Sequence, residues 1–321
     1  MKIVPYQDIY QETWDRFILE ESWNGTFLHT RRFLSYHNEQ FKDMSLIVQN
    51  DRGKIIAVFP SAEQPGDRYS VMSHPGITYG GLVAGPDLRG EDCVDSLANV
   101  GRYYRDLGYK RLYYKAVPHI YHVQPYQDDL YALFRLGGKH YRDDISCCID
   151  LDNRGEISKG HKWSANKAIK NGINIFTGSM YASFIMELVS QRLLAKYAAM
   201  PVHTTAEILL LHNRFPENIL FAVASCGSEV VAGTVIFVTK NVFHTQYLAA
   251  SDKGQNMSAM NLLLESCIIM AKDQNKRYFD FGTSNEKEGS YLNQGLFLFK
   301  TRFGSGSVVH EDYDLDLRNL E

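Results

Sequence analysis

The sequence lacks most features that would place it outside the cytoplasm. Its longest apolar runs, such as VVAGTVIFV, are much shorter than the roughly 20 residues that a membrane-spanning helix needs. The N-terminal stretch MKIVPYQDIYQETWDRF has no continuous apolar core, so we expect no secretory signal. The five cysteines lack the spacing of metal ligands and favour a reducing compartment over a disulfide framework. These absences predict a cytoplasmic protein without a membrane span.

The sequence also lacks the short motifs that identify many enzymes. It contains no phosphate-binding Walker loop, no dinucleotide-binding glycine fingerprint and no nucleophile elbow. His119 and His122 are spaced closely enough to share a metal, but no third ligand accompanies them, so we expect no metal site. The formal net charge of -3 argues against non-specific nucleic-acid binding as the main function.

The sequence does contain a repeat, because the same order of helices and strands is predicted in each half. In the first half, helical segments precede a strand–turn–strand segment, a further strand, an amphipathic helix that Gly108 is expected to cap, and a closing strand. The second half repeats this order in the segments MYASFIMELVSQRLLAKY, TTAEILLLHNRF, NILFAVASCGSEVVAGTVIFVTK, VFHTQYLAAS, MSAMNLLLESCIIMAKDQN and KRYFDFG.

Parts of the two halves are similar residue by residue. NDRGKIIAVFP resembles SCGSEVVAGTVIF, and YRDLGYKRLYYKAV resembles AKDQNKRYFDFGT, at an offset of about 170 residues. A repeat of this size indicates a duplicated domain. We therefore predict an α/β (α+β) fold of two tandem domains, 1–152 and 153–321, each a mixed, mostly antiparallel sheet flanked by helices. The polar, basic segment DLDNRGEISKGHKWSANKAIKNG is the expected link.

Asp280 is the first candidate functional residue. Strand alternation in YFDFG places Asp280 on the face opposite to Phe279 and Phe281. A carboxylate near a strand end among aromatic residues must be solvated, paired or used. Asp280 either bonds the backbone of the following loop or acts as a substrate-orienting carboxylate or general base, since ligands gather beyond strand ends in α/β sheets.

Lys300 is the second candidate. The alternation in GLFLFKTRFG predicts a strand with Lys300 and Leu298 on one face. A half-buried lysine needs an anion. Asp280 on a neighbouring strand is one such anion, and a substrate phosphate or oxyanion is the other.

A loop after VFHTQYLAAS could bind the donor. The residues Lys253, Gly254, Gln255 and Asn256 precede a helix, where free N–H groups can bind a phosphate. An ordinary strand–helix turn explains the same residues. Tyr247 in the strand is either a packing residue or a proton donor to a leaving thiolate.

Two further segments could contact an acceptor. In SHPGITYGGLVAGP, Gly80 and Gly81 allow close backbone approach and Tyr79 could stack on a ligand, although a bulged strand would look alike. In the link, Lys162 and Asn166 share a predicted helix face with further lysines. This face is either a solvated surface or a binding site for a diphosphate or an RNA end.

The chain as a whole resembles the GNAT acyltransferase superfamily, and within it the Fem-like (FemAB-type) proteins with two GNAT domains. The resemblance covers nearly the whole chain and rests on WNGTFLHTRRFL, HPGITYGGLV, KWSANKAIKNGINI, VVAGTVIF, TQYLAAS, RYFDFGTS and GLFLFKTRFGSG. The usual coenzyme A loop, Arg/Gln-x-x-Gly-x-Gly/Ala, is replaced by SDKGQNMSA, and the second half has no long charged heptad segment for a tRNA-handling hairpin.

The resemblance implies a site and a reaction. Asp280, Phe281, Gly282 and Lys300 would line the active site of the second domain, and the Tyr79 segment would face the acceptor. The reaction would move an acyl group from acyl-CoA or an acyl-carrier-protein thioester to an amine, on an amino sugar, a sugar nucleotide or another bacterial cell-envelope polysaccharide precursor. We do not expect tRNA as a partner. A Fem-type transferase that uses aminoacyl-tRNA, and a non-catalytic GNAT-like binding protein, are the alternatives.

Overall fold

The computed structural model describes residues 1–320, and these fall into two compact units. The first unit comprises residues 1–144 and the C-terminal segment from Val309, and the second comprises Ile145–Val308. The C-terminal segment therefore belongs to the first unit, whereas the division predicted from the sequence assigns it to the second half. The boundary at 152/153 stays a prediction about domains.

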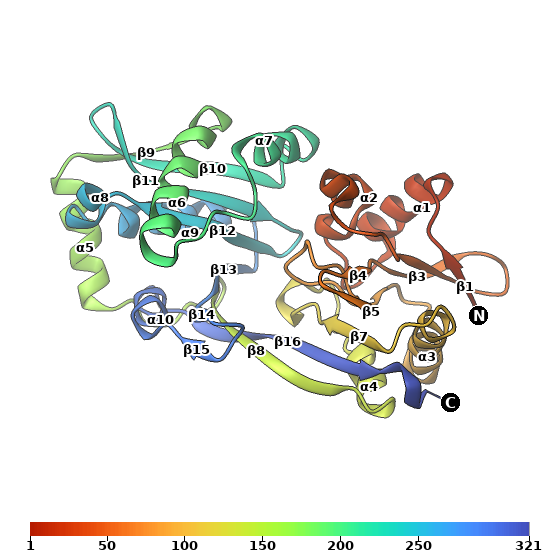
Figure 1. The fold of residues 1–321 in the computed structure, drawn as a ribbon. Helices are drawn as coiled ribbons and strands as arrows, with labels where there is room; N and C mark the ends of the chain where they lie inside the picture. Colours follow the sequence, from red (N-terminus) through yellow and green to blue (C-terminus); the bar gives the residue numbers. More distant parts are fainter. Residues whose placement is uncertain (321) are drawn as a thin grey trace. The chain divides into compact units, whose positions relative to one another are not determined.

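The first unit holds two groups of strands with helices beside them (Figure 1). Its elements are β1 (Lys2–Pro5), α1 (Gln11–Arg16), α2 (Arg31–Leu34), β2 (Leu46–Gln49), β3 (Ile55–Phe59), β4 (Ala62–Gln64), β5 (Asp67–Met72), β6 (Val83–Ala84), α3 (Gly90–Asp106), β7 (Arg111–Lys115) and α4 (Asp128–Arg135). Two strands, β8 (Lys139–Asp150) and β16 (Gly306–Asp316), belong to both units. Strands pair in the order β1-β2-β3-β6 and, separately, β4-β5-β7-β16.

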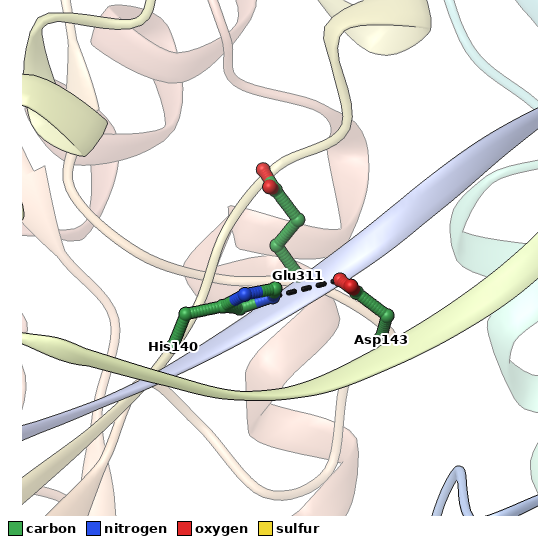
Figure 2. Close-up of side chains that lie close together, drawn as sticks. All are labelled: His140, Asp143 and Glu311. Atoms are coloured by element: carbon green, nitrogen blue, oxygen red, sulfur yellow. Dashed lines mark hydrogen bonds and ion pairs between the residues drawn. The ribbon is translucent and has the colours of Figure 1, made fainter.

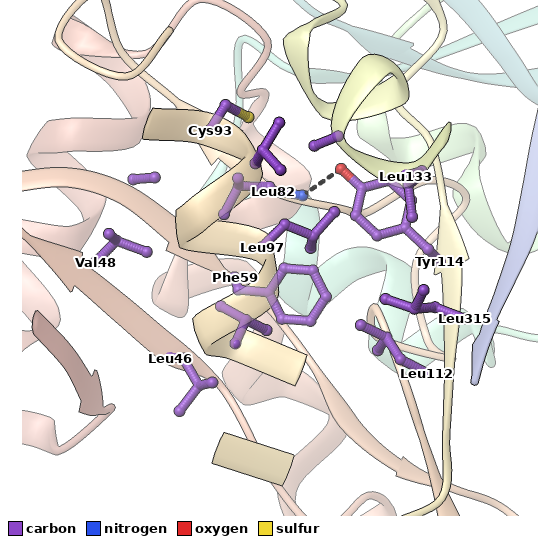
Figure 3. Packing of buried hydrophobic residues seen from close by; sticks show 14 of the residues in the cluster. Leu46, Val48, Phe59, Leu82, Cys93, Leu97, Leu112, Tyr114, Leu133 and Leu315 are labelled. Atoms are coloured by element: carbon purple, nitrogen blue, oxygen red, sulfur yellow. Dashed lines mark hydrogen bonds between the residues drawn. The ribbon is translucent and has the colours of Figure 1, made fainter. Parts of the chain in front are cut away.

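A continuous apolar core explains why the C-terminal strand joins the first unit. Leu315 of β16 is buried in the same cluster as Leu112 of β7 and Leu97 of α3 (Figure 3). The buried Tyr114 hydroxyl in this core accepts the backbone N–H of Leu82 at 2.8 Å. Exposing Leu315 would return its side chain to water at a cost of about 1.5–3 kcal/mol.

The second unit contains one mixed sheet between helices. Its elements are α5 (Lys159–Lys170), β9 (Ile173–Thr177), α6 (Ala182–Tyr197), α7 (Thr205–Arg214), β10 (Ile219–Cys226), β11 (Glu229–Val238), β12 (Val242–Ala250), α8 (Asp252–Asn256), α9 (Ala259–Asp273), β13 (Tyr278–Thr283), β14 (Asn285–Glu286), β15 (Tyr291–Leu292) and α10 (Gln294–Thr301). Strands pair in the order β8-β13-β12-β11-β10-β9, and all neighbours are antiparallel except β12 and β13.

Strand alternation assigns the two faces of this sheet to different helices. Ala232 of β11 lies in the cluster formed with α9, whereas the next residue, Gly233, lies against Ile185 of α6. A Cβ on Gly233 would approach the Ile185 side chain to 2.6 Å, so glycine lets α6 pack close to the sheet. Phe279 and Phe281 face α9, which confirms the predicted alternation around Asp280.

The internal repeat is visible in each unit taken by itself. In the first unit, β5 and β7 are parallel and joined by α3. In the second unit, β12 and β13 are parallel and joined by α9. The mixed α/β fold predicted from the sequence is confirmed. Among the described residues, no helix combines the length and the apolar character needed to cross a membrane.

One predicted element is wrong. The segment 294–301 is the helix α10, not a strand, and the Asn293 side chain caps it by accepting the N–H of Leu296. The apolar pattern fits both periods, because Leu296, Phe299 and Phe303 also follow the i, i+3, i+7 spacing of one helix face. The cap decides the choice between the two.

Candidate active site

Two parallel strands of the second unit diverge and leave a gap. β12 and β13 pair only from Val242–Tyr278 to His244–Asp280, although both strands continue. On its other edge β13 pairs with β8 from Tyr278 to Thr283, with a register shift between Asp280 and Thr283. Backbone groups of β12 that face the gap are therefore not used by β13 and can bind an extended ligand.

A bulge in β12 lies at the start of this gap. Val235 of β11 faces Tyr247 and the next residue, Ile236, faces Thr245, so Gln246 is an extra residue in β12. A bulge takes one residue out of the hydrogen-bond ladder and re-aims its backbone. Among the described residues, the buried Thr245 Oγ1 and Gln246 Oε1 have no hydrogen-bond partner. Buried polar atoms of this kind are expected where a ligand or water completes a site.

Asp280 and His244 form a hydrogen-bonded pair beside the gap. The Asp280 side chain is completely buried, and its Oδ2 accepts a hydrogen bond from His244 Nδ1 at 2.9 Å. Oδ1 accepts from the Gly282 N–H at 3.0 Å and from the Ser146 hydroxyl. These bonds fix the carboxylate, and they fix His244 in the tautomer whose Nε2 carries the lone pair.

Gly282 lies next to the imidazole of His244. Its φ of 73° is in the left-handed region that favours glycine, and a Cβ there would lie 3.4 Å from His244 Cε1. Gly282 thus packs against the His244 ring and also donates its N–H to the carboxylate that holds this ring. Phe281, by contrast, points into the core, with its ring centroid 5.1 Å from that of Phe303.

Lys300 is buried and holds the end of β13. Its Nζ donates to the carbonyl oxygens of Gly282 at 2.7 Å and Thr283 at 2.8 Å. Burial lowers the pKa of Lys300 to about 8, and the nearby Asp280 carboxylate opposes that effect. The sequence analysis expects Asp280 or a substrate anion as the partner of Lys300. In the structure the ammonium comes from a helix and bonds two carbonyl oxygens of the residues that follow Asp280.

Tyr247 is held by a residue that sequence analysis missed. The His203 N–H donates to Tyr247 Oη at 3.2 Å, and His203 Nδ1 lies 2.7 Å from the same oxygen. Burial raises the pKa of Tyr247 above its usual value, so the phenol keeps its proton at neutral pH. This protonation state is the one that a proton donor requires.

The segment 253–256 forms the short helix α8 at the end of β12. The Gly254 N–H donates to Ser251 Oγ at 3.1 Å and the Gln255 N–H donates to the Ser251 carbonyl at 2.9 Å, so these two amides already have acceptors. Lys253 is exposed and pairs with Glu229 at 2.5 Å. Donor binding by Lys253, Gly254, Gln255 and Asn256 stays a prediction. The next helix, α9, has no side-chain cap at its N-terminus, so its first turn leaves N–H groups for a ligand.

In the first unit, the chain itself fills the corresponding gap. Ser73, which follows β5, donates its N–H to Tyr113 O of β7, and Gly80 donates to Lys115 O at 3.0 Å. A Cβ on Gly80 would collide with the Ser73 carbonyl, and one on Gly81 with Tyr114. The close approach that these glycines permit is therefore to the protein itself, to backbone at Gly80 and to a tyrosine ring at Gly81.

Tyr79 lies in the same filled region. It is buried, and its ring centroid is 4.4 Å from that of Tyr121. By register, Tyr113 takes the place in β7 that Asp280 takes in β13. The first unit has no carboxylate at this position, and acceptor binding by Tyr79, Gly80 and Gly81 stays a prediction.

Lys162 and Asn166 lie on the exposed face of α5, as the helical spacing predicts. The opposite face is anchored by His161, whose Nε2 lies 3.1 Å from Glu265 of α9. Arg154 forms a bidentate pair with the same carboxylate, both contacts 2.8 Å, and lowers the pKa of Glu265 to about 2 together with His161. This network fixes α5, so its outer face is a defined surface, but nothing brings Lys162 or Asn166 into contact with Asp280.

One group of metal-type ligands occurs in the first unit among the described residues. His140, Asp143 and Glu311 place one donor atom each within 4.8 Å of the others (Figure 2). His140 Nε2 already bonds Asp143 Oδ1 at 2.8 Å, and both side chains are exposed. An exposed ion pair of this kind is common without a metal, so the expectation of no metal site stays a prediction.

His244, Ser146 and His203 are the site residues that sequence analysis missed. His244 had a signal, because alternation in VFHTQY puts it on the face opposite to Phe243, as alternation in YFDFG does for Asp280. Ser146 and His203 reach the site only through tertiary pairing, for which the sequence offers no local pattern.

Comparison with known proteins agrees with this geometry. A family model described as an acetyltransferase (GNAT) domain matches residues 174–290. No curated protein matches the chain. Solved structures with similar folds include FemX, with 11% identity, 98% of this chain and 97% of that chain covered and a TM-score of 0.70. A tandem GNAT protein from the clavulanic acid biosynthesis pathway gives 12% identity, 98% of both chains and a TM-score of 0.54. L-PGS from Bacillus licheniformis has 12% identity and a TM-score of 0.59, with 88% of this chain and 90% of that chain covered.

These likenesses define the fold of the protein. Residues 174–290 match the model of a GNAT domain and contain the diverging strands, the bulge and the His244–Asp280 pair. The chain as a whole has the fold of a Fem-like protein with two tandem GNAT-like domains. At these identities the structures establish the fold alone.

Proposed function

We propose that the chain is an N-acyltransferase that moves an acyl group from a thioester donor to an amine, with its reaction centre in the second unit. The observation that carries this proposal is the His244–Asp280 pair beside the gap between β12 and β13. A histidine oriented by a buried carboxylate has the arrangement of a general base. Asp280 is a positioning residue in this account, because it is buried and acts through His244.

The reaction needs little beyond correct positioning. The amine nitrogen attacks the thioester carbonyl carbon, and His244 Nε2 accepts the proton that the nitrogen loses. The backbone N–H at the Gln246 bulge stabilises the negative charge on the carbonyl oxygen. The carbon–sulfur bond then breaks, and Tyr247 supplies a proton to the thiolate. Lys300 keeps the loop that carries Gly282 in place.

The donor and the acceptor are the finer parts of the proposal. We propose acyl-CoA or an acyl-carrier protein as the donor. An amino sugar or cell-envelope polysaccharide precursor, presented as a small molecule or a sugar nucleotide, is the proposed acceptor. A cytoplasmic location follows from such substrates. Lys162 and Asn166 would contact an anionic acceptor, which their exposure allows.

A second candidate is a Fem-type transferase that takes its acyl group from aminoacyl-tRNA. The exposed face of α5 favours it, because Trp163 is 65% exposed and lies among four lysines, with no acidic residue in the helix. Basic side chains around an exposed aromatic ring suit single-stranded nucleic acid. Retention of charged tRNA on a filter at low salt, and its release at moderate salt, would support this donor.

Thiol release tests the first proposal. Purified protein, acetyl-CoA or octanoyl-CoA and a panel of amino sugars should release free thiol only when an amine is present. The His244→Gln variant should lower this rate by about 100-fold or more, the usual loss for a general base, without weakening donor binding. The proposal is overturned if no thioester is bound, or if His244→Gln transfers at the rate of the unchanged protein.

A further inference from the structure

The loop that joins α6 to α7 exposes apolar side chains beside the candidate active site. Met200 is 67% exposed and Val202 is 80% exposed, and Leu194 at the end of α6 is also exposed. The loop 198–202 reads Ala-Ala-Met-Pro-Val and contains no charged residue. Surface loops are normally polar, and apolar groups gathered on one surface mark binding sites.

Contacts with β12 place this loop along the gap. His203 follows Val202 directly and bonds Tyr247 Oη through its backbone N–H at 3.2 Å. Consecutive Cα atoms are about 3.8 Å apart, so the backbone of Val202 lies close to His203, the residue that bonds Tyr247. Arg192 of α6 donates to the Ala250 carbonyl of β12 at 2.6 Å. The end of α6 and the following loop therefore flank the part of β12 that has left β13.

The other side of the gap is linked to the same loop. Lys196 Nζ, two residues before the loop, lies 3.7 Å from Glu286 Oε1 in the segment that follows β13. Glu286 in turn accepts a hydrogen bond from Asn293 Nδ2 at 2.6 Å. The end of α6 and the loop are thus attached to residues that continue both strands of the gap.

We propose that the exposed apolar residues at this surface, Leu194, Met200 and Val202, bind the hydrocarbon chain of the donor's acyl group, so that the enzyme prefers acyl groups longer than acetyl. This inference rests on the proposed thioester-dependent function and names its substrate class. The acyl chain is the occupant that fits, because it is the apolar part of the reactants and is bonded to the carbon that His244, Gln246 and Tyr247 surround. The acceptor carries a polar amine, and placing an amine against apolar side chains costs free energy because they offer it no hydrogen bond.

Donor binding tests the preference for chain length. Isothermal titration with acetyl-CoA and octanoyl-CoA as probes should show octanoyl-CoA bound at least about tenfold more tightly by the unchanged protein, since each buried CH₂ group favours binding. The double variant Met200→Ser with Val202→Ser should reduce this ratio below about threefold and leave acetyl-CoA binding unchanged. Met180→Ser, at a site 75% exposed elsewhere in the second unit, is the matched control and should keep the tenfold ratio.

Each outcome decides between the two proposals. Equal binding of both probes by the unchanged protein overturns the acyl-chain site and leaves the acyltransferase intact. Binding of neither probe overturns the donor cleft and the acyl-chain site together. If instead the double variant abolishes a concentration-dependent dimer and keeps the full preference for octanoyl-CoA, the surface is an interface between copies of the chain and the inference is wrong.

Discussion

The Asp280→Asn variant is expected to fold normally and to transfer acyl groups about 100-fold to 10,000-fold more slowly. Asparagine has almost the same shape, and its oxygen can still accept the hydrogen bonds of Ser146 and Gly282. Its amide nitrogen would then face His244 Nδ1, where the carboxylate Oδ2 lies now. Two donors cannot face each other, so His244 must move its proton to Nε2 and lose the lone pair that accepts the proton of the amine.

The measurement is kcat/KM together with the thermal unfolding midpoint. The midpoint should fall by only a few degrees, since the packing is conserved. Asp273→Asn, at an exposed aspartate of α9, is the matched control and should leave kcat/KM unchanged. Full activity in Asp280→Asn would show that the buried carboxylate has no part in the reaction. Loss of the fold would show that Asp280 is structural, and His244→Gln then remains as the test of the base.

The Lys300→Met variant is expected to lose about 3 kcal/mol of free energy of unfolding at pH 7. Methionine fills a similar volume but leaves the Gly282 and Thr283 carbonyl oxygens without their donor. It also removes the positive charge near Asp280. Removing one member of a buried set of charges and carbonyls leaves the others uncompensated, which is the costly case.

The cost of this substitution should also grow with pH. Burial lowers the pKa of Lys300 to about 8 in the folded protein, from about 10.5 in an unfolded chain. Between these values the unfolded state binds more protons, so the stability due to Lys300 rises as pH rises through 8. The stability difference between the unchanged protein and Lys300→Met should therefore be about 1–2 kcal/mol larger at pH 9.5 than at pH 7.

Urea unfolding of both proteins at the two pH values gives this difference and cancels the titration of other groups. Lys272→Met, at an exposed lysine of α9, should show neither the loss nor the pH dependence. A cost below about 1 kcal/mol at pH 7, or a cost that shrinks toward pH 9.5, would mean that Lys300 does not hold the end of β13 in the way described.

Much of the fold follows from patterns within the sequence. The repeated order of elements and the residue-level similarity of the two halves indicate a duplication, and the diverging parallel strands of each unit agree with it. Alternation in YFDFG correctly separates Asp280 from its aromatic neighbours. The segment around Lys300 could not be decided in this way, because its apolar residues satisfy the strand and helix periods together and only the Asn293 cap separates them.

The site is only partly predictable for a different reason. Asp280 and Lys300 can be selected from the sequence because a charge among aromatic residues must have a partner. The identity of the partners depends on strand register, which brings His244 beside Asp280 and places Ser146 two residues from Cys148, the residue of β8 that faces Asp280. Register is set by tertiary pairing, so a local pattern can place His244 on the face opposite to Phe243 but cannot pair it with Asp280. A local pattern also cannot identify the residue that holds Tyr247.

Hydrogen–deuterium exchange with and without octanoyl-CoA tests the central claim most directly, because it locates the donor without assuming an acceptor. The account predicts slower exchange in residues 245–256 and 281–284, which border the gap in the second unit, and unchanged exchange in residues 70–82, where the chain fills the equivalent gap itself. Protection of residues 70–82, with none in the second unit, would contradict it.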